Sequence, residues 1–266
     1  MNSASGTARI LAPLAWVGGM SLGAVRHVGA ATGLLGQAIL SALRPPFLSP
    51  RLLFQQAYQI GVASIPVVVI TGLFTGMVLA LQSLDAFGRF GAEELVATVV
   101  SLAMMRELGP VLTGLMVAGR VGSAMAAELG TMRITEQIDA LTTLGTNPVR
   151  YLVLPRIIAS LLMMPCLVIF ANAVGIFGGF VVAVHLFGQN PALYERRAIQ
   201  YLDSGDLTMS LTKALVFGGV FSVVSCYQGY HVTGGAREVG LAVTRSVVIS
   251  LMGILAFNYV LTAWLS

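Results

Sequence analysis

Charged residues are scarce in this sequence. Asp, Glu, Lys and Arg make up 10% of its 266 residues, whereas 56% are hydrophobic and the mean hydropathy is +0.86. Because a soluble domain carries about 25% charged residues, a soluble globular fold is excluded for a chain of this composition. The net charge of +4 is too small to indicate binding of nucleic acid.

Lysine is almost absent, and this rules out ATP binding through a phosphate-binding loop of the chain's own. Fourteen of the fifteen basic residues are arginine, and the one lysine, Lys213, lies in LTKAL rather than in GxxxxGKS/T. The sequence also lacks HExxH and GxSxG, and its three histidines are scattered. We therefore expect no bound metal, no catalytic residues and no enzymatic activity in this chain.

Cysteine is too rare for a disulfide framework or a zinc site. Cys166 and Cys226 lie in separate apolar runs and form no CxxC pair. We expect both to be small buried hydrophobic residues.

Long apolar runs are what the sequence has instead. They are continuous rather than alternating between apolar and polar residues, which favours helices that cross a membrane. The sequence predicts an all-α, polytopic membrane protein with a single domain, residues 1–266, and no internal repeat. The five predicted spans are about 60–81, 95–130, 152–187, 209–230 and 241–265.

Two of the predicted spans have features of their own. Gly72 and Gly76 give the first span a small-residue face for close helix contact. Residues 152–187 would form a helix of about 54 Å, well beyond the ~30 Å hydrocarbon core. This span must therefore tilt, kink near Pro165 or project from the bilayer. The polar segment 188–208 that follows predicts a loop with a short helix.

The segment before the first span, residues 10–43, is apolar but carries Arg26 and His27 in its middle. A signal peptide would need a basic start and a cleavage site, and only Arg9 precedes the apolar run. A full span would place Arg26 near the bilayer centre, at a cost of about 2.5–3.5 kcal/mol. We favour an interfacial helix whose charges face the head groups. Arg44-Pro45-Pro46 would end it.

The distribution of arginines predicts the orientation in the membrane. With the N-terminus inside and the C-terminus outside, nine basic residues fall on the inner side and four on the outer side. This majority agrees with the positive-inside rule. The inner residues are Arg9, Arg26, Arg44, Arg51, Arg133, Arg150, Arg156, Arg237 and Arg245, and the outer ones are Arg89, Arg196, Arg197 and Lys213.

Arg106 and Glu107 stand out because they lie about ten residues into the second span, just before Gly109-Pro110. An ionisable pair at that depth is costly and is usually turned towards a cavity or a partner. One interpretation is a structural pair that neutralises itself. The other places the guanidinium in a water-accessible pocket, where it suits an anionic group such as a phosphate.

A ridge of small residues follows at intervals of four. Such a ridge lets another helix approach closely, either from the same chain or from a second copy. Arg120 and Glu128 flank it, and we interpret them as structural partners near the inner surface. The ridge consists of Gly114, Ala118, Gly122, Ala126 and Gly130.

After the ridge the pattern changes to that of a short polar helix, about residues 136–144. Thr135 is the expected N-cap, Glu136 and Asp139 place negative charge in the first turn, and Gly145 fits the C-terminal cap. At ~14 Å it is too short to span a bilayer. It is either an ordinary amphipathic loop helix or the surface that contacts a soluble motor subunit. Its expected apolar side consists of Ile138, Leu141 and Leu144.

The stretch RELGPVLTGLMVAGRVGSAMAAELGTMRITEQIDALTTLGTNPVRYLVLPR closely resembles the MlaE (YrbE) permease family. The resemblance extends from about Leu52 to the C-terminus and includes TGLFTGMVLALQ, LTKALVFG and GGAREVGLAVTRSVV. It implies the membrane subunit of an ABC transporter that moves phospholipids between the inner and outer membranes and maintains outer-membrane lipid asymmetry. The implied location is a bacterial inner membrane.

The resemblance also implies a set of partners. These are a second copy of the chain in a homodimer, an MlaF-like ABC ATPase that binds ATP and Mg²⁺, an MlaB-like STAS-domain protein and a periplasmic MlaD-like MCE hexamer. The chain itself would hold no cofactor, and membrane phospholipid would be its substrate.

Two sets of site residues follow from the resemblance. The lipid pocket would include Arg106, Glu107 and Lys213, with Leu73, Met77 and Leu81 facing acyl chains. The helix that couples to the ATPase would carry Glu136, Gln137, Ile138, Asp139, Ala140 and Leu141.

Two other functions compete with this one. A secondary transporter would be driven by an ion gradient, with Arg106 and Glu107 as its coupling pair. A membrane scaffold would anchor partners without transporting anything, and Arg106 would then be structural.

Overall fold

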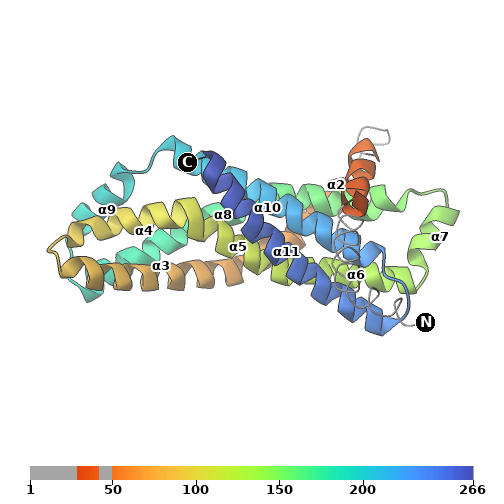
Figure 1. The fold of residues 1–266 in the computed structure, drawn as a ribbon, viewed down its shortest axis with the longest axis horizontal. Coiled ribbons are helices and arrows are strands. Elements are labelled where there is room, and N and C mark those ends of the chain that lie inside the picture. The colour runs from red at the N-terminus through yellow and green to blue at the C-terminus, as the bar shows by residue number, and fades with distance from the viewer. Residues whose placement is uncertain (1–28, 42–49, 266) are drawn as a thin grey trace, which may run out of the picture.

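The computed structural model describes residues 29–41 and 50–265, and this part of the chain is almost entirely helical, without a β-strand (Figure 1). Five of its helical segments are long and apolar enough to cross a membrane, which confirms the predicted number of spans. They are Pro50–Gly88, Glu93–Ile134, Val149–Leu186, Ser204–Tyr230 and Ala236–Leu265.

The first span consists of two helices of different character. The amphipathic α2 (Pro50–Ile60) leads through the short 3₁₀ turn η1 (Val62–Ser64) into the apolar α3 (Ile65–Gly88). Alone, α3 measures about 36 Å at ~1.5 Å per residue, enough for the hydrocarbon core. The sequence analysis missed α2. Residues 29–41 are also helical, but most of the expected interfacial helix, with Arg26 and the Arg44-Pro45-Pro46 stop, lies outside the described residues.

The second span is a chain of short helices joined by π-helical turns. After the 3₁₀ turn η2 (Glu93–Leu95) come α4 (Val96–Ala103), α5 (Gly109–Val117) and α6 (Ser123–Ile134). The π segments η3 (Met104–Leu108) and η4 (Ala118–Gly122) connect them. Because π turns add a residue to the helical repeat, each one rotates the following face of the span.

The third span runs from the π segment η5 (Val149–Val153) through α8 (Leu154–Val181) to the π segment η6 (Val182–Leu186). It continues through Pro165 without ending. The last two spans are α10 (Ser204–Tyr230) and α11 (Ala236–Leu265). The fifth span thus begins about five residues earlier than the sequence predicted.

Close contact between α3 and α8 depends on glycine. A Cβ at Gly76 would lie 1.8 Å from the carbonyl oxygen of Gly175, and one at Gly72 would lie 2.9 Å from that of Ala171. The backbones can therefore approach only because these positions lack side chains. This confirms the small-residue face predicted at Gly72 and Gly76.

The small-residue ridge of the second span contacts helices of the same chain. Gly114 faces Phe217 of α10, Gly122 faces Ser225 of α10, and Gly130 faces Val239 of α11. The structure thus resolves the alternative that the sequence left open. Phe217 and Phe221 are completely buried and form the centre of the apolar core with residues of α3, α5, α8 and α11.

Two short helices mark opposite ends of the subunit in Figure 1. At one end lies α7 (Gln137–Thr143), between the second and third spans. At the other lies α9 (Pro191–Gln200). Asn190 is its N-cap, and the Asn190 side chain accepts a hydrogen bond from the N–H of Ala192. The short helix predicted within 188–208 is confirmed. Of the two cysteines expected to be buried, Cys226 is buried but Cys166 is exposed.

Candidate functional site

Pro110 explains the local shape of the second span. It has no N–H, so the carbonyl oxygen of Arg106, four residues earlier, loses the partner that a regular helix would provide. The chain widens into the π segment Met104–Leu108, where the N–H of Gly109 bonds to the carbonyl of Met104. The π turn therefore places Arg106 and Glu107 at a point where the backbone offers a free acceptor.

Lys213 of α10 supplies a hydrogen-bond donor to this free acceptor. Its ammonium donates hydrogen bonds to the carbonyl oxygen of Arg106 (2.7 Å), to Oε1 of Glu107 (2.7 Å) and to Oγ1 of Thr262 (2.8 Å). These three acceptors use all three donors of the ammonium group. The side chain of Lys213 is 0% exposed. A buried lysine is tolerated here because its charge is paired and its donors are satisfied.

Glu107 connects the second span to α11. Its Oε2 accepts from Nδ2 of Asn258 (2.9 Å), and its Oε1 accepts from Oγ1 of Thr262 (2.8 Å) as well as from Lys213. Asn258 and Thr262 are four residues apart and so lie on one face of α11. Three spans are thus joined through one carboxylate, whose side chain remains 38% exposed.

Arg106 has a different partner. Its Nε donates to Oδ1 of Asp206 at 2.6 Å. Asp206 also caps α10, because its Oδ2 accepts from the N–H of Asp203. The carboxylate of Asp206 is enclosed, with 6% of its side chain exposed, whereas the side chain of Arg106 is 51% exposed. The guanidinium of this pair is therefore accessible, and the carboxylate is buried.

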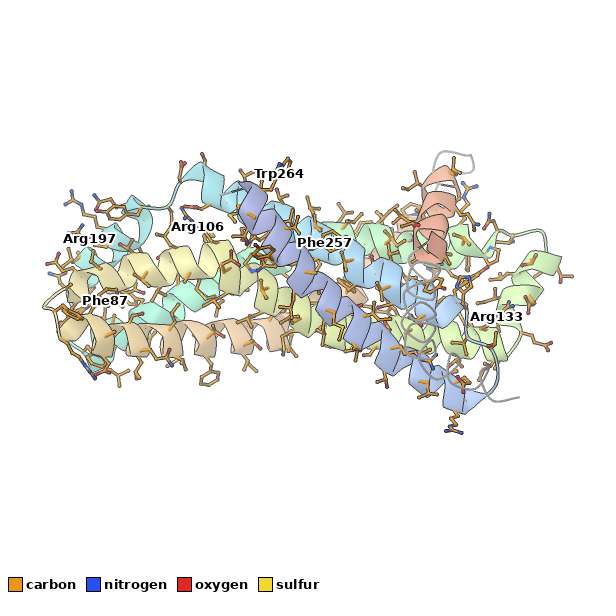
Figure 2. The ribbon with its side chains drawn as sticks, viewed as in Figure 1. Phe87, Arg106, Arg133, Arg197, Phe257 and Trp264 are labelled. Carbon is orange, nitrogen blue, oxygen red and sulfur yellow. The ribbon has the colours of Figure 1, made fainter. Side chains whose placement is uncertain are left out.

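The polar cluster consists of Arg106, Glu107, Asp206, Lys213, Asn258 and Thr262. In Figure 2, Arg106 lies towards the α9 end of the subunit and Arg133 towards the α7 end. The sequence analysis identified Arg106, Glu107 and Lys213 and missed the other three. The polar residues Asn258 and Thr262, four positions apart in an apolar span, were the signal that could have found them.

The sequence analysis counted Lys213 among the basic residues on the outer side of the membrane, but the structure shows it inside the helix bundle. It lies well inside α10 and is fully buried, so it does not belong to an outer loop. Its ammonium contacts Glu107 and Thr262 and has no donor left for a ligand. Lys213 therefore acts within the cluster by fixing Glu107 and the carbonyl of Arg106.

The three apolar positions expected beside acyl chains are not part of the polar cluster. Both Leu73 and Met77 are partly buried, and at Gly178 of α8 the neighbours are the backbone carbonyl of Leu73 and the side chain of Met77. Leu81 is 49% exposed on the outer side of α3.

The turn before α7 differs from the expected cap. Thr135 is not an N-cap: it ends α6, and its hydroxyl donates to the carbonyl of Thr131. The chain reverses at Glu136, whose φ of 59° is the one positive value among the described non-glycine residues. The C-terminal prediction is confirmed, since Gly145 has a φ of +72°. The N–H of Thr146 bonds to the carbonyl of Leu141, completing a Schellman motif.

The faces of α7 also differ in part from the prediction. Ile138 is buried at 1% exposure, but Leu144, expected on the same side, is 79% exposed. Asp139 forms an ion pair of 2.7 Å with Arg133, so part of the acidic charge is neutralised within the chain. Glu136, Gln137 and Ala140 are exposed. The surface available to a partner is therefore polar with one projecting leucine.

Comparison with known proteins identifies the family. The family described as Permease MlaE matches residues 53–264. A probable ABC transporter permease of Rickettsia conorii is 51% identical over 226 residues, covering 85% of this chain and 86% of that protein. A probable ABC transporter permease of Synechocystis is 42% identical over 236 residues and 89% of each chain.

A plant relative is more distant. The Arabidopsis thaliana protein TRIGALACTOSYLDIACYLGLYCEROL 1, chloroplastic, is 38% identical over 231 residues, covering 87% of this chain and 66% of that protein. With five membrane spans, a helical turn between the second and third, and a family match over most of its length, this chain belongs to the MlaE family of ABC transporter permeases.

Proposed function

We propose that this chain moves phospholipids as the permease subunit of an ABC transporter in a bacterial inner membrane, exchanging lipid between the inner and outer membranes. The observation that carries this proposal is the exposed guanidinium of Arg106 within an apolar span, held by a buried carboxylate. Asp206 uses only the Nε of Arg106, so the exposed guanidinium keeps N–H donors that suit a phosphate. One relative bears the name of a galactolipid, which also points to lipid as the substrate class.

Arg106 and Glu107 supply opposite charges to this pocket. Arg106 would bind the phosphate, while the partly exposed Glu107 could accept hydrogen bonds from an amine of a zwitterionic head group. Lys213 acts as a positioning residue, because it fixes the carboxylate of Glu107. Of the apolar candidates, Leu81 has the most accessible side chain, Leu73 is partly buried, and Met77 contacts α8.

The α7 end would face the cytoplasm. Excluding the buried Lys213, the basic residues still favour the α7 end, which agrees with an N-terminus inside and a C-terminus in the periplasm. There α7 would contact an MlaF-like ATPase through Glu136, Gln137, Asp139 and Ala140, with Ile138 and Leu141 fixing the helix to its own subunit. ATP and Mg²⁺ would be bound by that partner.

The complete assembly in this proposal is a homodimer of the chain with two ATPase subunits, an MlaB-like STAS-domain protein and a periplasmic MlaD-like MCE hexamer. The test is reconstitution of this complex into vesicles with fluorescent phospholipid, followed by measurement of lipid transfer with and without ATP. We expect transfer only when the ATPase and ATP are present.

Two results would contradict the proposal. Transfer by the isolated chain in an ion gradient would indicate a secondary transporter. A complex that contains no co-purifying phospholipid and transfers none would indicate a scaffold.

A further inference from the structure

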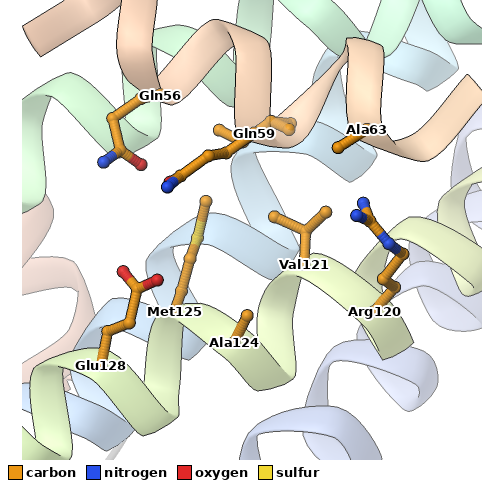
Figure 3. Close-up of a pocket in the computed structure, with 9 residues that line it drawn as sticks. Gln56, Gln59, Ala63, Arg120, Val121, Ala124, Met125 and Glu128 are labelled. Atoms are coloured by element: carbon orange, nitrogen blue, oxygen red, sulfur yellow. The ribbon is translucent and has the colours of Figure 1, made fainter.

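A second polar site lies near the α7 end, in a cleft between α2 and α6 (Figure 3). The cleft contains a cavity of about 270 Å³. In Figure 3, Gln56 of α2 lies across the cleft from Glu128 of α6, and Ala63 of η1 lies across it from Arg120 of η4. A neighbouring cavity of about 320 Å³ shares Gln56, Gln59 and Glu128 with the first and extends to Arg156 of α8.

The charges in the cleft do not cancel. Arg156 is buried, and its Nη2 donates to Oε2 of Glu128 at 2.8 Å, so these two charges neutralise each other. Arg120 donates to the hydroxyl of Ser64 at 2.8 Å, and none of the ion pairs found in the described residues includes it. One positive charge therefore remains in the cleft, where it is bound to a neutral hydroxyl group.

The cleft wall also contains an unsatisfied donor. Nε of Arg156 is buried and has no hydrogen-bond partner in the described structure, although its side chain lines the second cavity. A buried N–H without an acceptor is unfavourable. The other nitrogens of this guanidinium donate to the carbonyl of Leu152 and to Glu128, so Arg156 is held in the cleft wall and is not the group that a ligand would reach first.

The position of the cleft matches the head-group region of the membrane. The apolar helix α3 begins at Ile65, next to the Ser64 that binds Arg120, whereas α2 is amphipathic. Phe54 and Tyr58 of α2 are 76% and 63% exposed on its outer side. Exposed aromatic residues beside a span are typical of the membrane interface. Arg120 thus lies near the boundary between head groups and hydrocarbon.

We propose that this cleft binds the head group of a phospholipid from the leaflet on the α7 side. The guanidinium of Arg120 would bind the phosphate oxygens, and the amides of Gln56 and Gln59 would donate to the same head group. The acyl chains would leave the cleft past Ala63 and Ala124 into the hydrocarbon. In this proposal Arg120 binds lipid, whereas the sequence predicted a purely structural role for it. The site is separate from the Arg106 cluster, about 21 Å away along the span at ~1.5 Å per residue, and does not depend on the proposed transport function.

The experiment measures binding of dihexanoyl phosphatidylglycerol, a soluble short-chain lipid, to the delipidated full-length protein by native mass spectrometry. The variants are Arg120→Gln and the matched control Arg51→Gln, which removes an exposed arginine of α2 that lines neither cavity. We expect Arg120→Gln to weaken binding of one lipid per subunit roughly tenfold or more, the usual effect of losing a charged hydrogen bond. Arg51→Gln should leave that binding event unchanged.

A second variant distinguishes loss of the binding site from a folding defect. Ala124→Phe keeps every charge but places a ring in the cavity, so it should remove the same lipid without altering the thermal unfolding midpoint. Inorganic phosphate alone should not displace the lipid. Three results would each overturn the proposal. The first is an equal loss of binding in Arg120→Gln and Arg51→Gln, and the second is binding that persists in Ala124→Phe. The third is displacement of the lipid by phosphate at equal concentration, which would identify a site for free anions.

Discussion

The ammonium of Lys213 occupies the place that the missing N–H of Pro110 leaves beside the carbonyl oxygen of Arg106, at 2.7 Å. A backbone carbonyl that lacks its helical partner in one span thus accepts a hydrogen bond from a side chain of another span. The same ammonium neutralises Glu107, so the π turn, the proline and the buried lysine form one unit. The polar cluster is therefore buried at Lys213 and Asp206, and its most exposed charged groups are Arg106 and Glu107.

Replacing Lys213 with methionine should destabilise the protein strongly. The variant keeps the volume of the side chain but leaves the carbonyl of Arg106 without a donor and the carboxylate of Glu107 without its positive partner. Breaking a buried ion pair in this way costs about 3–5 kcal/mol. The free energy of unfolding in detergent, measured by titration with a denaturing detergent, would report the loss.

The double variant Lys213→Met, Glu107→Gln is the control for this prediction. It removes both charges, so part of the stability should return, while the carbonyl of Arg106 stays unpaired. If Lys213→Met unfolds at the same denaturant concentration as the wild type, the ammonium is not needed to satisfy these groups.

The lipid binding proposed for Arg106 can be tested separately from its structural role. Arg106→Gln alone leaves the enclosed Asp206 charged and unpaired, and should reduce both stability and bound lipid. In the double variant Arg106→Gln, Asp206→Asn, the asparagine amide can donate to the glutamine and still accept from the N–H of Asp203. Stability should then recover to within about 1 kcal/mol, but lipid occupancy by mass spectrometry should stay low. Full lipid occupancy in the double variant would assign Arg106 to structure alone.

The sequence predicted the spans and half of this cluster, for identifiable reasons. Long apolar runs determine helix number, because the bilayer requires about 20 apolar residues per span. Arg106 and Glu107 were conspicuous because charge is rare in such a run. Asp206 was not, because it falls in the polar segment 188–208, which was predicted to be a loop with a short helix, whereas it lies in the first turn of α10. Its second bond, to Arg106, joins residues 100 apart and depends on the packing of two spans.

The region around α7 shows the limit of local rules. A threonine before a polar helix is a good N-cap candidate, but here Thr135 still belongs to α6 because its N–H bonds to the carbonyl of Thr131. The turn falls instead on Glu136 in a left-handed conformation, which propensity does not favour for this residue. The cap at Gly145 was predictable, because glycine adopts a positive φ without steric cost.

Substituting Gly76 with alanine should disrupt the first span. The new methyl group would lie 1.8 Å from the carbonyl oxygen of Gly175, and the backbone at that position has no room to withdraw. Overpacking of this kind costs about 1–3 kcal/mol or more. The matched control is Gly119→Ala in the second span, where nothing lies within 4 Å of the added carbon. Thermal unfolding should show a loss for Gly76→Ala and none for Gly119→Ala, and equal effects would contradict the close α3–α8 contact.

Reversing the charge of Glu136 should weaken coupling to the ATPase without harming the fold. Its side chain is exposed and takes part in none of the ion pairs found in the described residues, whereas Asp139 is paired with Arg133. Glu136→Lys should therefore reduce ATP-driven lipid transfer in the reconstituted complex while the unfolding midpoint stays near that of the wild type. Unchanged transfer with a normal complement of ATPase would argue against a coupling role for this residue.

Ile138 in α7 and Leu144, which follows the helix directly, allow stability and coupling to be tested separately. Ile138 is 1% exposed and packs beneath α7, so Ile138→Ala should lower the free energy of unfolding by about 2–5 kcal/mol. Leu144 is 79% exposed and projects from the end of the helix. Because it contributes little to the subunit core, Leu144→Ala should change stability by no more than about 0.5 kcal/mol. If α7 contacts the ATPase, Leu144→Ala should nevertheless lower the amount of ATPase that co-purifies with the chain, because an exposed leucine gains stability only when a partner covers it. Undiminished co-purification of the ATPase in Leu144→Ala would place the contact elsewhere on the α7 end.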